Sequence, residues 1–93
     1  MDRDEVLVTA GSLISGDRHA QYGEAKDAFK RYAIGWSIIL DHKVEPWQVA
    51  LCMDWLKTCR AIETPGKDDT WVDKAGYSAL GGELATSSPS PKS

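Results

Sequence analysis

The spacing of apolar and polar positions along the chain predicts helices over almost its whole length. Apolar residues recur at spacings of three and four, which is typical of amphipathic helices, and no stretch alternates as a strand would. Together with capping residues and turn signals, this pattern predicts four helices near residues 3–15, 24–41, 46–62 and 70–84. Four helices with short connections predict an all-α fold, most simply a four-helix bundle.

The third predicted helix, residues 46–62, differs from an ordinary surface helix, which has a single apolar face. It carries two apolar stripes, which consist of Val49, Cys52, Met53, Leu56 and Cys59 and of Leu51, Trp55 and Ile62. A narrow strip remains for solvent, at Asp54, Thr58 and Ala61. We therefore expect this helix to be buried on two sides and to be the most buried helix of the fold.

The two cysteines, Cys52 and Cys59, share one of these stripes. Two helical turns separate them by roughly 10 Å, which is too far for a disulfide. We expect them to be small core residues of a reduced, cytosolic protein rather than metal ligands.

The second predicted helix, residues 24–41, carries Ile34 and Ile38 on its otherwise polar side. Such a pair suggests a contact with another helix or another subunit. The third helix also has more apolar surface than one bundle can bury. Since symmetric pairing of one surface is the commonest way to cover such a patch, we expect a homo-oligomer, most simply a dimer.

Composition sets limits on the class of protein. The chain has 93 residues, 42% of them hydrophobic and 27% charged, with a net charge of −3. This length predicts one domain, residues 1–84, followed by a disordered tail, residues 85–93, that has no large apolar side chain. The acidic balance argues against a nucleic-acid binder. No apolar run is long enough to span a bilayer, and the acidic start does not resemble a signal peptide, so we expect a cytoplasmic protein.

Charged residues near the apolar stripes are the candidates for chemistry. Arg60 lies within the first stripe of the third helix, Lys57 lies on its edge, and Asp73 borders the apolar stripe of the fourth helix. A short loop makes these two helices antiparallel neighbours, so we expect Arg60 to meet Asp73. One interpretation is a partly buried ion pair that fixes helix register. The other is a cationic pocket for a phosphate-bearing ligand, formed with Lys57 and Arg18.

The segment GDRHAQYG, residues 16–23, is polar and lies between two glycines just before a helix. Free N–H groups at a helix start attract anions, so Arg18 and Tyr22 are candidate ligand-binding residues. The alternative is a plain connector, in which Arg18 pairs with Asp17 and Tyr22 packs on the core.

Four segments carry a resemblance to a known family: GDRHAQYG, the aromatic-rich FKRYAIGWS, VALCMDWLKTCR and DDTWVDKAGYSALG. They resemble small phage and prophage proteins without assigned function, over most of residues 14–84. That family is in turn distantly similar to the MazG-like all-α nucleoside triphosphate pyrophosphohydrolases. The resemblance implies an oligomeric helical bundle in the cytoplasm of an infected or lysogenic bacterium. It also implies cleavage between the α- and β-phosphates of a nucleotide with Mg²⁺.

MazG-like enzymes hold Mg²⁺ with an E-x-x-E pair on one helix and an E-x-x-D pair on a later one, spacings that place both carboxylates on one face. The corresponding positions here are Glu24 with Asp27 and Thr70 with Asp73, where Thr70 replaces an acid and Asp69 lies one turn from Asp73. The resemblance therefore implies Asp69 and Asp73 as metal ligands.

Two functional hypotheses follow. The first is a phage-type nucleotide-handling protein, a binder or a weak or inactive pyrophosphohydrolase, whose ligand-binding residues are Arg18, Tyr22, Lys57, Arg60 and Asp73. The second is a non-enzymatic helical oligomer that binds a host protein.

Overall fold

The computed structural model describes residues 1–15 and 24–86, which form helices with no strand among them. The helices are α1 (Arg3–Ser15), α3 (Ala25–Leu40), α4 (Pro46–Glu63) and α5 (Asp68–Thr86). The predicted all-α class is confirmed, and each predicted helix is present with its ends displaced by no more than two residues. The last helix includes residues 85 and 86, which the sequence assigned to the tail, and residues 87–93 lie outside the described part.

Local hydrogen bonds explain where the helices begin and end. Asp2 and Glu5 cap α1 reciprocally, because each backbone N–H donates to the other's carboxylate at 2.9 Å. The N–H of Glu45 donates to Oε1 of Gln48 at 2.8 Å just before α4. At the end of α3, Asp41 adopts a left-handed conformation with φ of 51°, and its N–H bonds back to the last turn. These caps use neighbours in sequence, so the boundaries are set locally.

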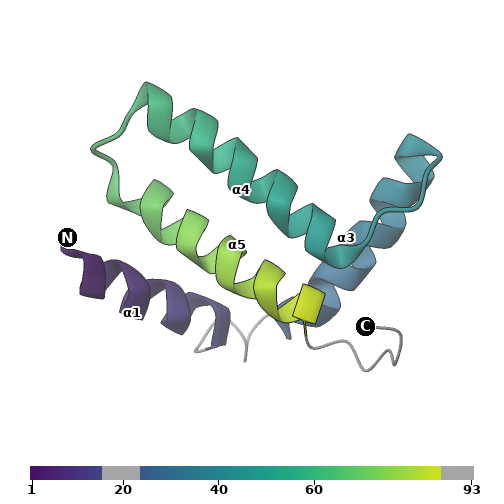
Figure 1. The fold of residues 1–93 in the computed structure, drawn as a ribbon, viewed down its shortest axis with the longest axis horizontal. Helices are drawn as coiled ribbons and strands as arrows, with labels where there is room; N and C mark the ends of the chain where they lie inside the picture. Colours follow the sequence, from purple (N-terminus) through teal and green to yellow (C-terminus); the bar gives the residue numbers. More distant parts are fainter. Residues whose placement is uncertain (16–23, 87–93) are drawn as a thin grey trace.

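Three of the helices lie side by side in one layer (Figure 1). α5 is in the middle, with α4 antiparallel to it on one side and α1 on the other. α3 crosses the end of this layer, where α4 begins and α5 ends. The helices therefore form an open arrangement, in which α1 and α3 are separated by a cleft, rather than a closed four-helix bundle.

The central helix is α5, which corrects the expectation that α4 would be the most buried. α5 lies between two neighbours and buries Thr70, Val72, Gly76 and Leu80. The main core lies where α3, α4 and α5 meet, and it consists of Phe29, Ala33, Val49, Ala50 and Leu80.

The face of α4 that packs on α5 is the one that the sequence assigned to solvent. Ala61 is buried, and the side chains of Asp54 and Thr58 both bond to Lys74 of α5. The stripe of Leu51, Trp55 and Ile62 is exposed instead. Small side chains allow α5 to approach closely, and the lysine satisfies the polar groups, so the polar strip is the better contact.

The positions of the two cysteines have the same cause, which is the orientation of α4 against α5. Cys52 and Cys59 are free thiols and both are exposed, so the expectation that they belong to the core is wrong.

Gly81 makes the close approach of α4 and α5 possible. A Cβ at Gly81 would lie 3.1 Å from Cβ of Ala50, whereas one at Gly82 would meet nothing within 4 Å. Alanine is favoured over glycine in a helix, so Gly82→Ala should raise the free energy of unfolding by about 0.5–1 kcal/mol. Gly81→Ala should not give this gain, because its methyl group must push α4 away. Urea unfolding of both variants tests this, and an equal gain in each would contradict the close packing.

Candidate functional site

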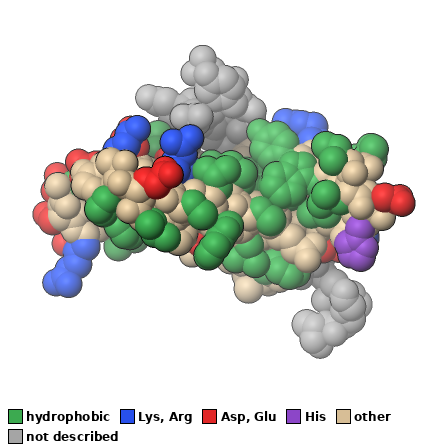
Figure 2. Space-filling model, turned by 90° about the horizontal axis from the view of Figure 1, so that it is seen from above, with side chains coloured by type: hydrophobic (Ala, Val, Ile, Leu, Met, Phe, Trp, Pro, Cys, Tyr) green, Lys and Arg blue, Asp and Glu red, His purple; other side chains and the backbone are tan. Residues whose placement is uncertain are grey.

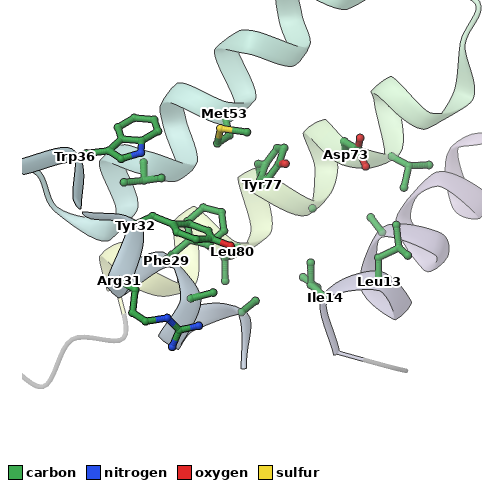
Figure 3. Close-up of a pocket in the computed structure, with 16 residues that line it drawn as sticks. Leu13, Ile14, Phe29, Arg31, Tyr32, Trp36, Met53, Asp73, Tyr77 and Leu80 are labelled. Atoms are coloured by element: carbon green, nitrogen blue, oxygen red, sulfur yellow. The ribbon is translucent and has the colours of Figure 1, made fainter. Parts of the chain in front are cut away.

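A cleft of about 810 Å³ lies between α1 and α3, with α5 and the start of α4 as its floor. Figure 3 shows its labelled residues, with Leu13 and Ile14 of α1 facing the side chains of α3 across the opening. Its lining is mainly apolar, and this size falls in the usual range for small-molecule sites, about 300–1,000 Å³. The full lining is Ala10, Leu13, Ile14, Ala25, Ala28, Phe29, Arg31, Tyr32, Trp36, Val49, Met53, Val72, Asp73, Gly76, Tyr77 and Leu80.

Aromatic rings form the α3 side of the cleft. Phe29, Tyr32 and Trp36 are spaced by three and four residues, so one helix face presents all of them. The ring centroid of Phe29 lies 5.3 Å from that of Tyr32 and 6.2 Å from that of Tyr77 on α5, in tilted arrangements. These contacts orient Phe29, Tyr32 and Tyr77 relative to one another, so the cleft has an aromatic wall.

Two charged side chains line the cleft at different places. Arg31 is exposed and lies at the edge beside the aromatic wall (Figure 3). Within residues 1–15 and 24–86, Arg31 makes no ion pair. Asp73 lies on α5, away from Arg31 in the same view. The cleft therefore offers a guanidinium and a carboxylate to a ligand at separate positions.

Asp73 is paired with Lys57, not with Arg60. Oδ2 of Asp73 lies 2.8 Å from Nζ of Lys57, and these side chains are 33% and 20% exposed. The expected Arg60–Asp73 contact is wrong, because the register of α4 against α5 brings Lys57 opposite Asp73. Arg60 lies almost one turn further along α4 and is exposed.

A second ion pair crosses the same helix contact. Nζ of Lys74 lies 2.7 Å from Oδ1 of Asp54 and donates to the hydroxyl of Thr58 at 2.6 Å. Both pairs are partly buried, so they fix the register of the two helices, which is one of the roles that the sequence suggested for charges at this position.

The predicted site residues are only partly brought together. Asp73 lines the cleft and is in contact with Lys57, whereas neither Lys57 nor Arg60 lines the cleft. Asp69 is in the first turn of α5 and is exposed. Arg18 and Tyr22 lie outside the described residues, as does the suggested contact of Tyr22 with the core. Among residues 1–15 and 24–86, no three His, Cys, Asp or Glu side chains are grouped as a metal site would require.

Arg31 and the aromatic wall were not among the site features predicted from the sequence. In the sequence, Phe29, Tyr32 and Trp36 belong to the wide apolar face of α3, and Arg31 belongs to its polar side. One signal in the sequence could have identified Arg31, which is that the apolar residue Ala28 lies one turn before it. Ala28 also lines the cleft. An arginine at the edge of so wide an apolar face is a candidate for the rim of a cavity.

No helix in the described part of the chain is long and apolar enough to cross a membrane.

The fold and the cleft define a small all-helical domain with an aromatic-lined cavity. The family follows from sequence comparison: residues 5–85 match the family described as "Domain of unknown function (DUF6378)", and the chain belongs to that family.

Two relatives are phage proteins. The chain is 39% identical over 77 residues to the Gene 55 protein of Mycobacterium phage L5 and 32% identical over 74 residues to the Gene 55 protein of Mycobacterium phage D29. The matches cover 81% and 80% of this chain and 49% of each relative, so the chain spans about half their length. The predicted relation to a phage protein family is confirmed. No solved structure matches the chain, and the more distant similarity to MazG-like enzymes stays a prediction.

Proposed function

We propose that the cleft binds a phosphate-bearing small molecule, and that a nucleoside triphosphate is the class that suits it best. One observation carries this proposal: Arg31, without an ion-pair partner among the described residues, lies beside a wall of aromatic rings in a cavity of about 810 Å³. A flat base can stack against Tyr32 or Trp36. A guanidinium can bind phosphate through two hydrogen bonds.

Asp73, held by Lys57, would act at another part of the ligand. Oδ2 of Asp73 is engaged by Lys57, which leaves Oδ1 to accept a hydrogen bond from a hydroxyl or amino group. A sugar or a base offers such donors, whereas a phosphate does not. The separate positions of Asp73 and Arg31 therefore favour binding of the ligand with its phosphates toward Arg31.

Hydrolysis of the MazG-like kind would require Mg²⁺ held by several carboxylates. Asp73, one of the two implied ligands, already contacts a lysine, and Asp69 is exposed in the first turn of α5. In the part of the chain that the structure describes, no third acidic, histidine or cysteine side chain completes a group with them. This donor set does not fit a metal centre, so we propose binding and derive no hydrolytic step.

Calorimetric titration with the common nucleoside triphosphates tests the proposal. Replacing Arg31 by glutamine should weaken binding about 10- to 100-fold, because a charge-assisted hydrogen bond contributes roughly 1.5–3 kcal/mol. Arg60→Gln is the matched control, since Arg60 is exposed and does not line the cleft. Equal losses in both variants, or no binding of any nucleotide at millimolar concentration, would contradict a site at Arg31.

A second candidate function is binding of a host protein, and the C-terminal half of α3 favours it. Ile34, Ile38, Ile39 and Leu40 are all exposed there, as the sequence predicted for the first two. A short apolar helix end of this kind fits an apolar groove on another protein. The nucleotide titration separates the two functions, since this second one requires no ligand in the cleft.

A further inference from the structure

Apolar side chains are exposed on the α4 side of the molecule, where they run along the middle of the view in Figure 2. Leu51, Trp55 and Ile62 of α4 are among the exposed apolar residues. Apolar groups alone do not distinguish one small ligand from another, because their contacts have no preferred direction. The cleft is different, since its lining combines aromatic rings with polar groups that can still form hydrogen bonds.

Two of these polar groups lie on one face of α5, and they are the hydroxyl of Tyr77 and the carboxylate of Asp73. The two residues are four positions apart, so their side chains are neighbours on the helix. Among residues 1–15 and 24–86, the Tyr77 hydroxyl makes no hydrogen bond and the Asp73 carboxylate pairs only with Lys57. An ionised carboxylate has about four acceptor positions, so Asp73 can accept further hydrogen bonds from a ligand.

The groups that line the cleft follow one another in a defined order (Figure 3). Arg31 lies at the edge, and the rings of Phe29 and Tyr32 on the same helix come next. The ring centroid of Tyr77 lies 6.2 Å from that of Phe29, and Asp73 is one turn before Tyr77 on α5. Asp73 therefore lies on the far side of the rings from Arg31.

A nucleotide has its groups in a matching order, because the sugar separates the base from the phosphates. In the proposed function, the phosphates bind near Arg31 and the base stacks on the aromatic wall. The free edge of the base is then directed away from the phosphates, toward Tyr77 and Asp73. These two side chains are therefore in a position to distinguish one base from another.

We infer that Asp73 and Tyr77 recognise the base of the bound nucleotide and select guanine, an inference that rests on the proposed function. An ionised carboxylate only accepts hydrogen bonds, and guanine is the common base with two N–H donors side by side on its free edge. The oxygen next to these donors accepts a hydrogen bond, which the hydroxyl of Tyr77 can donate. The edge of guanine thus complements both side chains.

The other common bases match these two side chains less well. Adenine and cytosine each offer one amino group beside an unprotonated ring nitrogen, whose lone pair a carboxylate repels. Uracil and thymine offer a single N–H between two carbonyl oxygens. A good two-bond contact to a base discriminates against the wrong base by about 5- to 150-fold, so we expect GTP to bind more tightly than ATP, CTP or UTP by a factor in this range.

Calorimetric titration of the native chain with GTP, ATP and inosine triphosphate tests the base preference. Inosine triphosphate lacks only the 2-amino group of GTP, so it should bind at least about 10-fold more weakly, because one hydrogen bond to a charged acceptor is lost. Equal binding of GTP and inosine triphosphate would overturn the inference. Binding of ATP as tightly as GTP would overturn it as well.

The Asp73→Asn variant tests the carboxylate directly. An amide offers one acceptor and one donor, which suits xanthine, because xanthine carries a carbonyl in place of the 2-amino group of guanine. The variant should therefore bind xanthosine triphosphate more tightly than GTP, whereas the native chain should show the reverse order. A purely structural role of Asp73 would change the stability of the domain without inverting this order, so an unchanged order would overturn the inference.

Asp54→Asn is the matched control for this variant. Asp54 also pairs with a lysine across the contact of α4 with α5, at 2.7 Å, but it does not line the cleft. Its replacement should leave the order of the nucleotides as in the native chain. Should Asp73→Asn fail to fold, as judged by circular dichroism, the comparison of GTP with inosine triphosphate in the native chain decides alone.

The Tyr77→Phe variant tests the hydroxyl, since it keeps the ring beside Phe29 and removes one donor. It should bind GTP about 2- to 10-fold more weakly. Inosine triphosphate should weaken by the same factor, because it has the same oxygen on its base. Unchanged GTP binding would overturn the assignment of Tyr77.

The titrations also separate this inference from the proposed function. Nucleoside triphosphates that bind with equal affinity, whatever their base, would overturn recognition of guanine and leave the phosphate site at Arg31 standing. No binding of any nucleoside triphosphate at millimolar concentration would overturn both.

Discussion

Replacing Leu80 by alanine should lower the free energy of unfolding by about 2–4 kcal/mol. Leu80 is 4% exposed and packs with Phe29, Ala33, Val49 and Ala50, where three helices meet. Truncation removes apolar contact from each of them and leaves a cavity that the helix ends cannot fill. For a domain of this size, the loss corresponds to a fall of roughly 10–25 °C in melting temperature.

Thermal unfolding followed by circular dichroism measures this effect. Ile39→Ala is the matched control, because Ile39 lies at the surface of α3 and its truncation should change stability by less than about 0.5 kcal/mol. A Leu80→Ala protein that melts together with the control would contradict the position of the core.

Replacing Lys74 by methionine should lower the free energy of unfolding by about 2–3 kcal/mol. The ammonium group of Lys74 bonds both the carboxylate of Asp54 and the hydroxyl of Thr58 across the contact of α4 with α5. Methionine fills a similar volume but leaves both groups without their donor in a partly buried position. The stranded carboxylate of Asp54 is the larger part of the cost.

Urea unfolding of three variants apportions this effect. Lys43→Met is the control, because Lys43 is 81% exposed and pairs loosely with Glu45 at 3.6 Å, so its loss should cost less than about 0.5 kcal/mol. Asp54→Leu combined with Lys74→Met should recover part of the stability, since no charge is then left unpaired. A double variant no more stable than Lys74→Met would reject coupling between the two charges.

Helix positions were predictable because the signals that set them are local. Asp2 caps α1 through Glu5, three residues away, and Pro46 with Glu45 starts α4. Such signals are read directly from neighbouring residues, and they do not depend on how the helices pack.

The packed face of α4 was not predictable from periodicity. Two apolar stripes offered equal reasons for burial, and the polar strip offered none. Lys74 of α5 makes the polar strip the packed face, because it neutralises Asp54 and bonds Thr58. Gly81 also favours this packing, because it has no side chain and lets Ala50 come into close contact. Both belong to another helix, so the outcome depends on a pairing that one helix alone does not encode.

The candidate site was predicted in one part and missed in another. Asp73 was identified because it borders an apolar stripe, and it does line the cleft. Its partner was misassigned, since a shift of less than one turn in helix register replaces Arg60 by Lys57. Arg31 was missed because its significance depends on α3 turning away from the layer, which leaves the cleft open beside it.

The attachment of α1 has a consequence for how the cleft can move. α1 buries Ala10 and touches α5 where Ile14 lies over Gly76, and a free helix of 13 residues is barely stable in water. We therefore expect the detachment of α1 to require less free energy than global unfolding. Because α1 is one wall of the cleft, opening costs only the docking energy of that helix, while the core of α3, α4 and α5 stays folded.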